Sequence, residues 1–171
     1  MPQAKTLLEI LIEEIAELYR LETRLSGLLP KMAQKASDAG LRSAMTRQMR
    51  ETQEHIHHLR RSFDLLGAGM HRSDEPPVSM LIVEDDQWME HSETGPVADA
   101  GLICIVLKID HYKTAGYLNA ATFARLLDLP EVAGLLELSV KLGSGLTHKT
   151  RRWSEGMDSP AEEEMPVMAF L

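Results

Sequence analysis

Cysteine is almost missing from this chain, which has one such residue, Cys104, among 171 positions. A single thiol cannot form an intramolecular disulfide, and it cannot build a zinc site that needs several cysteines. Cys104 lies in an apolar run, residues 102–107, where a buried and unreactive thiol is the expected state. The sequence therefore excludes a disulfide-rich scaffold and predicts only a packing role for Cys104.

Aromatic residues and long apolar runs are also scarce. Phe, Trp and Tyr make up 5% of the chain, whereas methionine occurs ten times. Because β-sandwiches favour aromatic and β-branched residues, this composition indicates helices. No apolar stretch approaches the roughly 18 residues of a membrane span, and the first residues lead into an amphipathic pattern with Glu13 and Glu14, unlike a signal peptide. We expect a cytoplasmic protein without membrane contact.

Positive charge is in deficit, with 18 Lys and Arg residues against 26 Asp and Glu residues, for a net charge of −8 at pH 7. Since affinity for nucleic acid depends on basic side chains that displace counterions from phosphates, nucleic-acid binding is not expected. The pairs Arg60-Arg61 and Arg151-Arg152, like the adjacent His57 and His58, are expected on solvated helix faces. No Gly-x-Ser-x-Gly turn or phosphate-binding glycine loop is present. These absences favour a protein that is not an enzyme.

The sequence does contain strong helical periodicity, with apolar residues at alternating spacings of three and four. It predicts four long helices, over residues 6–29, 41–66, 99–127 and 131–153. Pro30 and Gly67 are expected to end the first two, and Asp99 to cap the third. The long connection before the third helix should carry a short extra helix over residues 78–91, as in bundles whose chain crosses over. The predicted fold is an all-α four-helix bundle.

Composition also divides the chain into two parts. Residues 1–153 carry the helical pattern and should form the bundle. Residues 154–171 begin as an acidic linker and end in an apolar peptide. Four apolar side chains of this tail are candidates for docking a partner: Val167, Met168, Phe170 and Leu171.

Charged residues occupy positions that should face the bundle interior. Glu22 and Asp110 lie on the apolar seams of the first and third helices, and Glu51 and His55 flank the seam of the second. A buried carboxylate is costly unless it is paired, protonated or bound to a metal. Inward Glu and His side chains of four-helix bundles can hold two iron or manganese ions. A metal site is therefore one explanation for these residues.

Several segments resemble the YciE/YciF family of bacterial ferritin-like proteins. The matching segments are residues 18–25, 28–32, 51–59, 97–102 and 110–112, with Phe63, Leu66-Gly67 and Gly116-Tyr117. The resemblance implies a ferritin-like fold, a stress-response context and a di-metal site to which all four helices contribute.

The sequence departs from the family where metal would bind. The family typically has Glu-His-Tyr-Glu on the third helix, whereas this chain reads Asp110-His111-Tyr112-Lys113. The family also has a run of glutamates on the fourth helix, but residues 140–145 contain no carboxylate. Leu142 takes the seam position there, so this quarter of the bundle is expected to be dry and apolar. The ligands that remain for any metal are Glu22, Glu51, His55 and Asp110.

Lys113 offers these carboxylates a simpler partner. It follows Asp110 by three residues and can share the same helix face. Its long stem can cross apolar surface while the ammonium reaches a carboxylate. We predict that Lys113 contacts Glu22, Glu51 or Asp110, and that no di-metal centre exists.

Three functional hypotheses follow. The leading one is a non-catalytic structural or partner-binding protein of the bacterial stress-response type, with a degenerate metal site and no cofactor. The first alternative is an oxidase, peroxide-handling or storage protein that binds iron or manganese at a reduced carboxylate and histidine site. The second is an adaptor or cargo protein that acts through its C-terminal tail. A homodimer is expected, because residues 78–91 and 100–109 carry more apolar surface than one bundle core needs.

Overall fold

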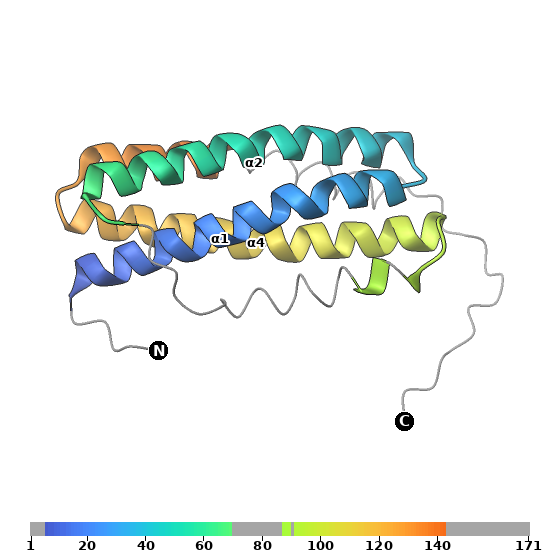
Figure 1. Ribbon diagram of the computed structural model, residues 1–171, viewed down its shortest axis with the longest axis horizontal. Helices are drawn as coiled ribbons and strands as arrows, with labels where there is room; N and C mark the ends of the chain where they lie inside the picture. The colour runs from blue at the N-terminus through green and yellow to red at the C-terminus, as the bar shows by residue number, and fades with distance from the viewer. Residues whose placement is uncertain (1–5, 70–86, 90, 143–171) are drawn as a thin grey trace, which may run out of the picture.

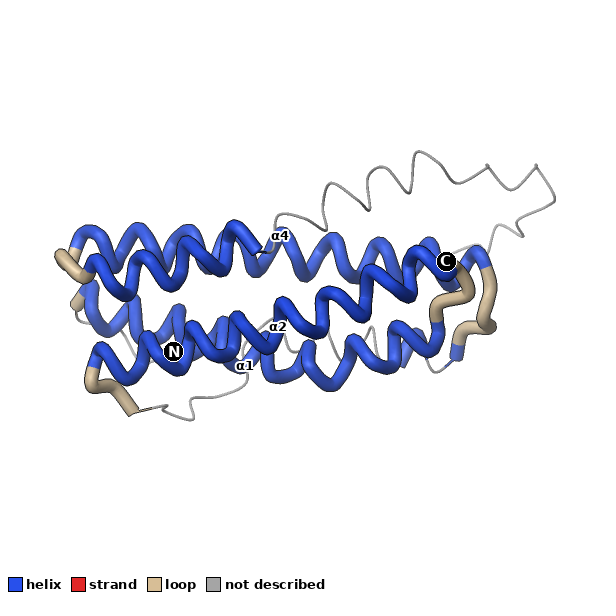
Figure 2. Tube along the Cα trace, turned by 90° about the horizontal axis from the view of Figure 1, so that it is seen from above, coloured by secondary structure: helices blue, strands red, loops and turns tan. Residues whose placement is uncertain are grey.

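The computed structural model describes residues 6–69, 87–89 and 91–142. Three long helices, α1 (Leu7–Lys35), α2 (Ala39–Leu66) and α4 (Pro96–Leu126), lie along one axis beside a further helical stretch, residues 130–142 (Figures 1 and 2). No strand occurs in these ranges, so the predicted all-α fold class is confirmed. None of the described helices is long and apolar enough to cross a membrane.

The first helix is longer than predicted, because α1 passes through Pro30 and ends at Lys35. The expectation that Pro30 ends it is wrong. A proline inside a helix costs about 3 kcal/mol. The turn after Pro30 buries Met32 and Ala36 in the core, however, and full burial of a Met side chain alone contributes about 1.5–3 kcal/mol. Burial therefore offsets most of the cost of continuing the helix.

The second helix has the ends that its sequence suggests. Asp38 caps α2 by accepting a hydrogen bond from the backbone N–H of Leu41 at 2.7 Å. At the other end Gly67 adopts the left-handed conformation, with φ of 60°, which glycine enters without the steric cost that a Cβ brings. The predicted end at Gly67 is confirmed.

The third long helix begins at Pro96, three residues before the predicted cap. Proline suits this position because the first helical N–H groups have no partner within the helix. Asp99 instead lies in the first turn of α4, where its buried carboxylate accepts hydrogen bonds from the backbone N–H groups of Ser37 and Asp38 at 2.8 and 2.9 Å. The capping prediction is therefore wrong. Asp99 ties the start of α4 to the turn between α1 and α2.

Part of the long connection is anchored on the core. Of the short helix predicted over residues 78–91, residues 87–89 and 91 are helical, and the others lie outside the described residues. Met89 is buried in the core. The indole of Trp88 lies against Gly101, where a Cβ would come within 2.1 Å of the ring. Gly101 thus leaves the space that Trp88 fills.

The helical stretch over residues 130–142 follows the predicted seam at Val132 and Ser139 but departs from it at Leu142. Val132, Leu136 and Ser139 are buried, whereas Leu142 is 40% exposed. The expectation of a dry, apolar quarter around Leu142 is therefore wrong: the inward position belongs to the hydroxyl of Ser139. The predicted continuation to residue 153 and the tail over residues 154–171 lie outside the described residues.

Cys104 is exposed, so the predicted buried thiol is also wrong. Leu102, Ile103, Ile105 and Val106 are the buried members of its apolar run. The run covers more of the circumference of α4 than the core can contact, and Cys104 lies on the outer side. Hydrophobicity alone could not indicate which residue of such a run faces outward.

The hydrophobic core consists of two clusters, one toward each end of the bundle. One cluster contains Leu25 of α1 and Ile109 of α4, and the other contains Leu18 of α1 and Tyr117 of α4. On α2 the two clusters contribute Met45 and Leu59. Between these positions on the three helices lie buried polar residues that belong to neither cluster; besides Asp110, they are Glu22, Gln48, Thr52, His55 and Lys113. We call these five residues the polar layer. It is the part of the fold that carries unusual chemistry.

Candidate functional site: a buried polar layer

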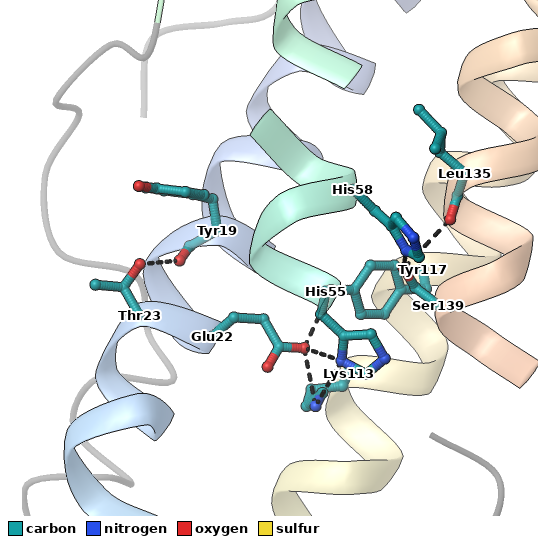
Figure 3. Close-up of polar contacts among 9 residues, drawn as sticks. All are labelled: Tyr19, Glu22, Thr23, His55, His58, Lys113, Tyr117, Leu135 and Ser139. Atoms are coloured by element: carbon teal, nitrogen blue, oxygen red, sulfur yellow. Dashed lines mark hydrogen bonds and ion pairs between the residues drawn. The ribbon is translucent and has the colours of Figure 1, made fainter. Parts of the chain in front are cut away.

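A buried ion pair forms the centre of the polar layer (Figure 3). The Lys113 ammonium lies 2.8 Å from Oε1 of Glu22, and His55 Nδ1 lies 2.9 Å from the same oxygen. Lys113 Nζ is also 3.3 Å from His55 Nδ1. All three side chains are at least 97% buried. One carboxylate oxygen from α1 is thus shared by a lysine from α4 and a histidine from α2.

The charge of Glu22 is stabilised by these neighbours. Desolvation by burial favours the neutral carboxyl and acts to raise its pKa. The Lys113 ammonium and the hydrogen bond from His55 act in the opposite direction and prevail, so the pKa of Glu22 is lowered below its ordinary value of 4.5. Glu22 is therefore ionised at neutral pH, and the Glu22–Lys113 contact is a true ion pair.

Tyr117 extends the contacts of Glu22 toward the helix at residues 130–142. Its hydroxyl donates a hydrogen bond to Oε1 of Glu22 at 3.1 Å, and Ser139 lies close to it. Burial, together with the adjacent Glu22 carboxylate, raises the pKa of Tyr117 well above 10, so the phenol stays protonated. Side chains from α1, α2 and α4 thereby meet at one carboxylate oxygen.

Ser139 carries the linkage toward the surface. Its Oγ lies 3.0 Å from Nδ1 of His58, which is half-buried on α2. Burial lowers the pKa of His58 below its ordinary value of 6.5, so the imidazole is neutral at pH 7. The predicted surface position of His57 is confirmed, but that of His58 is only partly correct, because its ring faces Ser139.

Four polar atoms of the layer have no hydrogen-bond partner although they are buried. They are Oε2 of Glu22, Oε1 of Gln48, Oγ1 of Thr52 and Nε2 of His55. Unpaired polar atoms away from water are rare in proteins and cost about 1–3 kcal/mol each. The ion pair therefore gives partners to Oε1 of Glu22 and Nδ1 of His55 but leaves Oε2 and Nε2 of the same side chains without any.

The structure separates the four residues that the sequence offers as metal ligands. It brings Glu22 and His55 into contact. Glu51 is half-buried and faces Arg47, whose Nε lies 3.4 Å away, while Asp110 is buried. Across residues 6–69, 87–89 and 91–142, no three His, Cys, Asp or Glu side chains gather into a group that could hold a metal ion.

A di-metal centre does not fit these residues. The predicted contact between Lys113 and Glu22 is confirmed, and it places an ammonium against the carboxylate that the centre would need. A metal ion there would face a like charge in a medium that screens charge poorly. The helix at residues 130–142 supplies the hydroxyl of Ser139 to this region rather than a carboxylate.

Sequence reasoning missed several members of the network. Tyr117 follows Lys113 by four residues, so shared spacing on α4 could have grouped it with the ion pair. Thr52 and Ser139 lie on predicted apolar seams, and polar residues at such positions are a signal in the same way as Glu22. The contact of His58 with Ser139 could not be predicted from the sequence, because it depends on the register of another helix.

The chain is similar to several known proteins. The family described as a domain of unknown function (DUF892) matches residues 6–142. Protein YciF of Escherichia coli (strain K12) is 28% identical over 134 residues, which cover 78% of this chain and 81% of YciF. The crystal structure of the E. coli stress protein YciF has a TM-score of 0.83 at 25% identity, over 89% of this chain and 96% of that one.

A second solved structure has the same fold. YcfI from Rhodopseudomonas palustris, for which a structural role has been suggested, has a TM-score of 0.80 at 24% identity, over 88% of this chain and 96% of that one. The match to YciF confirms the predicted fold, an all-α bundle of the ferritin-like type. It also confirms the resemblance to the YciE/YciF family that the sequence segments indicate. The chain belongs to the DUF892 family, whose match covers the helices and the polar layer between them.

Proposed function

We propose that this chain is a non-catalytic structural or partner-binding protein of the bacterial stress-response type, in which an ion pair takes the place of a metal centre. The observation that carries the proposal is the 2.8 Å contact between Lys113 Nζ and Glu22 Oε1. The ammonium supplies the positive charge that a buried carboxylate needs. The bundle then requires no cofactor for its integrity.

Two further observations support a structural role. The network around Glu22 joins α1, α2 and α4, and Tyr117 of α4 lies close to Ser139. Buried polar contacts of this kind can fix the register of helices more sharply than apolar contacts do. The similar protein YciF is named a stress protein, which supports the stress-response context.

Elemental content of the protein purified without chelator tests the proposal. We expect iron and manganese far below one ion per chain, and no change of melting temperature after treatment with a chelator. One or more ions per chain, lost in Glu22→Ala but retained in the exposed control Glu13→Ala, would establish the alternative of a reduced iron or manganese site. Binding after reconstitution with excess Fe²⁺ or Mn²⁺ would have the same meaning.

Partner binding is proposed for two surfaces. The outer side of α4 exposes Val97, Cys104 and Leu118, which are spaced by multiples of seven residues and therefore lie on one face. We propose this face as the site of homodimerisation. The apolar tail with Val167, Met168, Phe170 and Leu171 is proposed to dock a protein partner. It lies outside the described residues, so deletion of residues 165–171 is its test: a partner that co-purifies with the full chain should be lost.

A further inference from the structure

The inward side of α2 carries three polar residues where apolar ones would be expected. Gln48, Thr52 and His55 lie four and three residues apart, so they follow one face of the helix over about 10 Å. Each is at least 97% buried, and each has a polar atom without a partner. Oε2 of Glu22, across from α2, is unpartnered as well. The unpaired atoms therefore lie along the inward side of α2 and on the Glu22 carboxylate that meets it at His55.

The orientation of Thr52 points to a missing partner. A threonine in a helix can donate to the carbonyl four residues earlier, and Thr23, Thr46 and Thr122 all do so at 2.8–2.9 Å. Thr52 is fully buried, where this bond would be worth most, yet its hydroxyl makes no hydrogen bond. The Thr52 hydroxyl does not use the carbonyl acceptor that its own helix offers, and this implies a different partner in the interior.

The chemistry of the unpaired atoms defines that group. Oε2 of the ionised Glu22 and the amide oxygen of Gln48 can only accept hydrogen bonds. Nε2 of His55 is also an acceptor when Nδ1 donates to Glu22. The ligand must therefore donate hydrogen bonds, and it must be small because each of these side chains is at least 97% buried in the core. A cation is disfavoured by the Lys113 ammonium, which lies 2.8 Å from the other oxygen of Glu22.

We propose that the polar layer is a binding site for internal water, held by Glu22 Oε2, Thr52 Oγ1 and Gln48 Oε1 and reaching His55 Nε2. Water donates twice and accepts twice, so it satisfies acceptors and the Thr52 hydroxyl together. Buried water of this kind typically makes about three hydrogen bonds and is costly to remove. The inference rests on the proposed metal-free role, because a metal ion would claim the same atoms.

The effect of Thr52→Val on melting temperature has opposite signs for a hydrated and a dry layer. Valine matches threonine in shape but lacks the hydroxyl. In a hydrated layer the substitution removes a partner of bound water, so we expect a lower melting temperature. In a dry layer it removes an unpaired hydroxyl, so the melting temperature would stay the same or rise. Gln48→Met should lower the melting temperature too, and Thr122→Val, whose hydroxyl is exposed, should shift it much less.

Magnetisation-transfer NMR on the isotope-labelled wild-type protein detects internal water directly. This measurement does not require any variant to fold. We expect long-lived water with cross-peaks to the Thr52 methyl group and to the His55 ring proton between its nitrogens. Absence of both cross-peaks, or a melting temperature that does not fall in Thr52→Val, overturns the inference. In a metal-free sample these results leave the proposed function standing. Stoichiometric metal in the same sample overturns both.

Discussion

At the scale of single residues, the Glu22–Lys113 pair should be the most sensitive point of the bundle. Lys113→Met keeps an unbranched side chain of nearly the same length but leaves a carboxylate buried without its countercharge. Breaking a buried pair in this way costs about 3–5 kcal/mol. We expect a loss of this size in the free energy of unfolding, measured by urea denaturation.

A matched control separates the pair from the helix. Lys108→Met changes an exposed lysine on α4 and should alter stability by less than about 0.5 kcal/mol. Adding Glu22→Gln to Lys113→Met removes the unpaired charge and should recover part of the loss. Equal losses in Lys113→Met and Lys108→Met would mean that the pair contributes nothing.

His58 should make the stability depend on pH. Burial lowers its pKa in the folded state below the ordinary value of 6.5, so the unfolded chain binds the proton more readily. The contribution of neutral His58 is fully present above pH 6.5 and is lost as the pH falls through the folded pKa. We therefore expect the urea midpoint to fall between pH 7 and pH 5, and to fall less in His58→Gln. Parallel pH profiles of the two proteins would contradict this.

At the scale of elements, two glycines in helices should respond oppositely to alanine. A Cβ at Gly116 would lie 2.9 Å from Cδ2 of the buried Leu18, so α4 approaches α1 too closely for a side chain there. No atom lies within 4 Å of a Cβ at Gly134. Gly134→Ala should stabilise by up to about 1 kcal/mol through helix propensity. Gly116→Ala should destabilise by about 1–3 kcal/mol through overpacking. Thermal unfolding of the two variants, compared with the wild type, measures both signs.

At the scale of the whole molecule, we expect a homodimer through the outer face of α4. Leu118 is 52% exposed on this face, while Leu138 is 49% exposed on the helix at residues 130–142. Leu118→Glu should weaken the dimer, and Leu138→Glu serves as a control of equal exposure. Sedimentation equilibrium at micromolar concentration gives the mass directly. A wild-type mass of 19.1 kDa, that of one chain, would refute the prediction.

The sequence by itself determined the fold class and identified Lys113 as the countercharge, with Glu22, Glu51 and Asp110 as its possible partners. Apolar spacings of three and four persist over four long segments, and no other regular structure buries that pattern. A carboxylate at Glu22, inside such a pattern, requires a countercharge, and Lys113 was the basic residue on a neighbouring seam. Both conclusions depend on the spacing of residues within one helix, and this spacing follows directly from the local sequence.

Tertiary structure decided where α1 ends and which side of residues 130–142 faces the core along its whole length. Burial of Met32 stabilises the continuation of α1 beyond Pro30, whereas the local conformational preference of proline predicts that the helix ends there. The register of residues 130–142 keeps Ser139 inward, as the apolar spacing predicts, but turns Leu142 outward, and it brings Ser139 within 3.0 Å of His58. Such rotations depend on the summed contacts with three other helices, because several faces of an apolar helix can enter a core at similar local cost. The sequence could therefore supply the charges of the polar layer, but only packing could fix their partners.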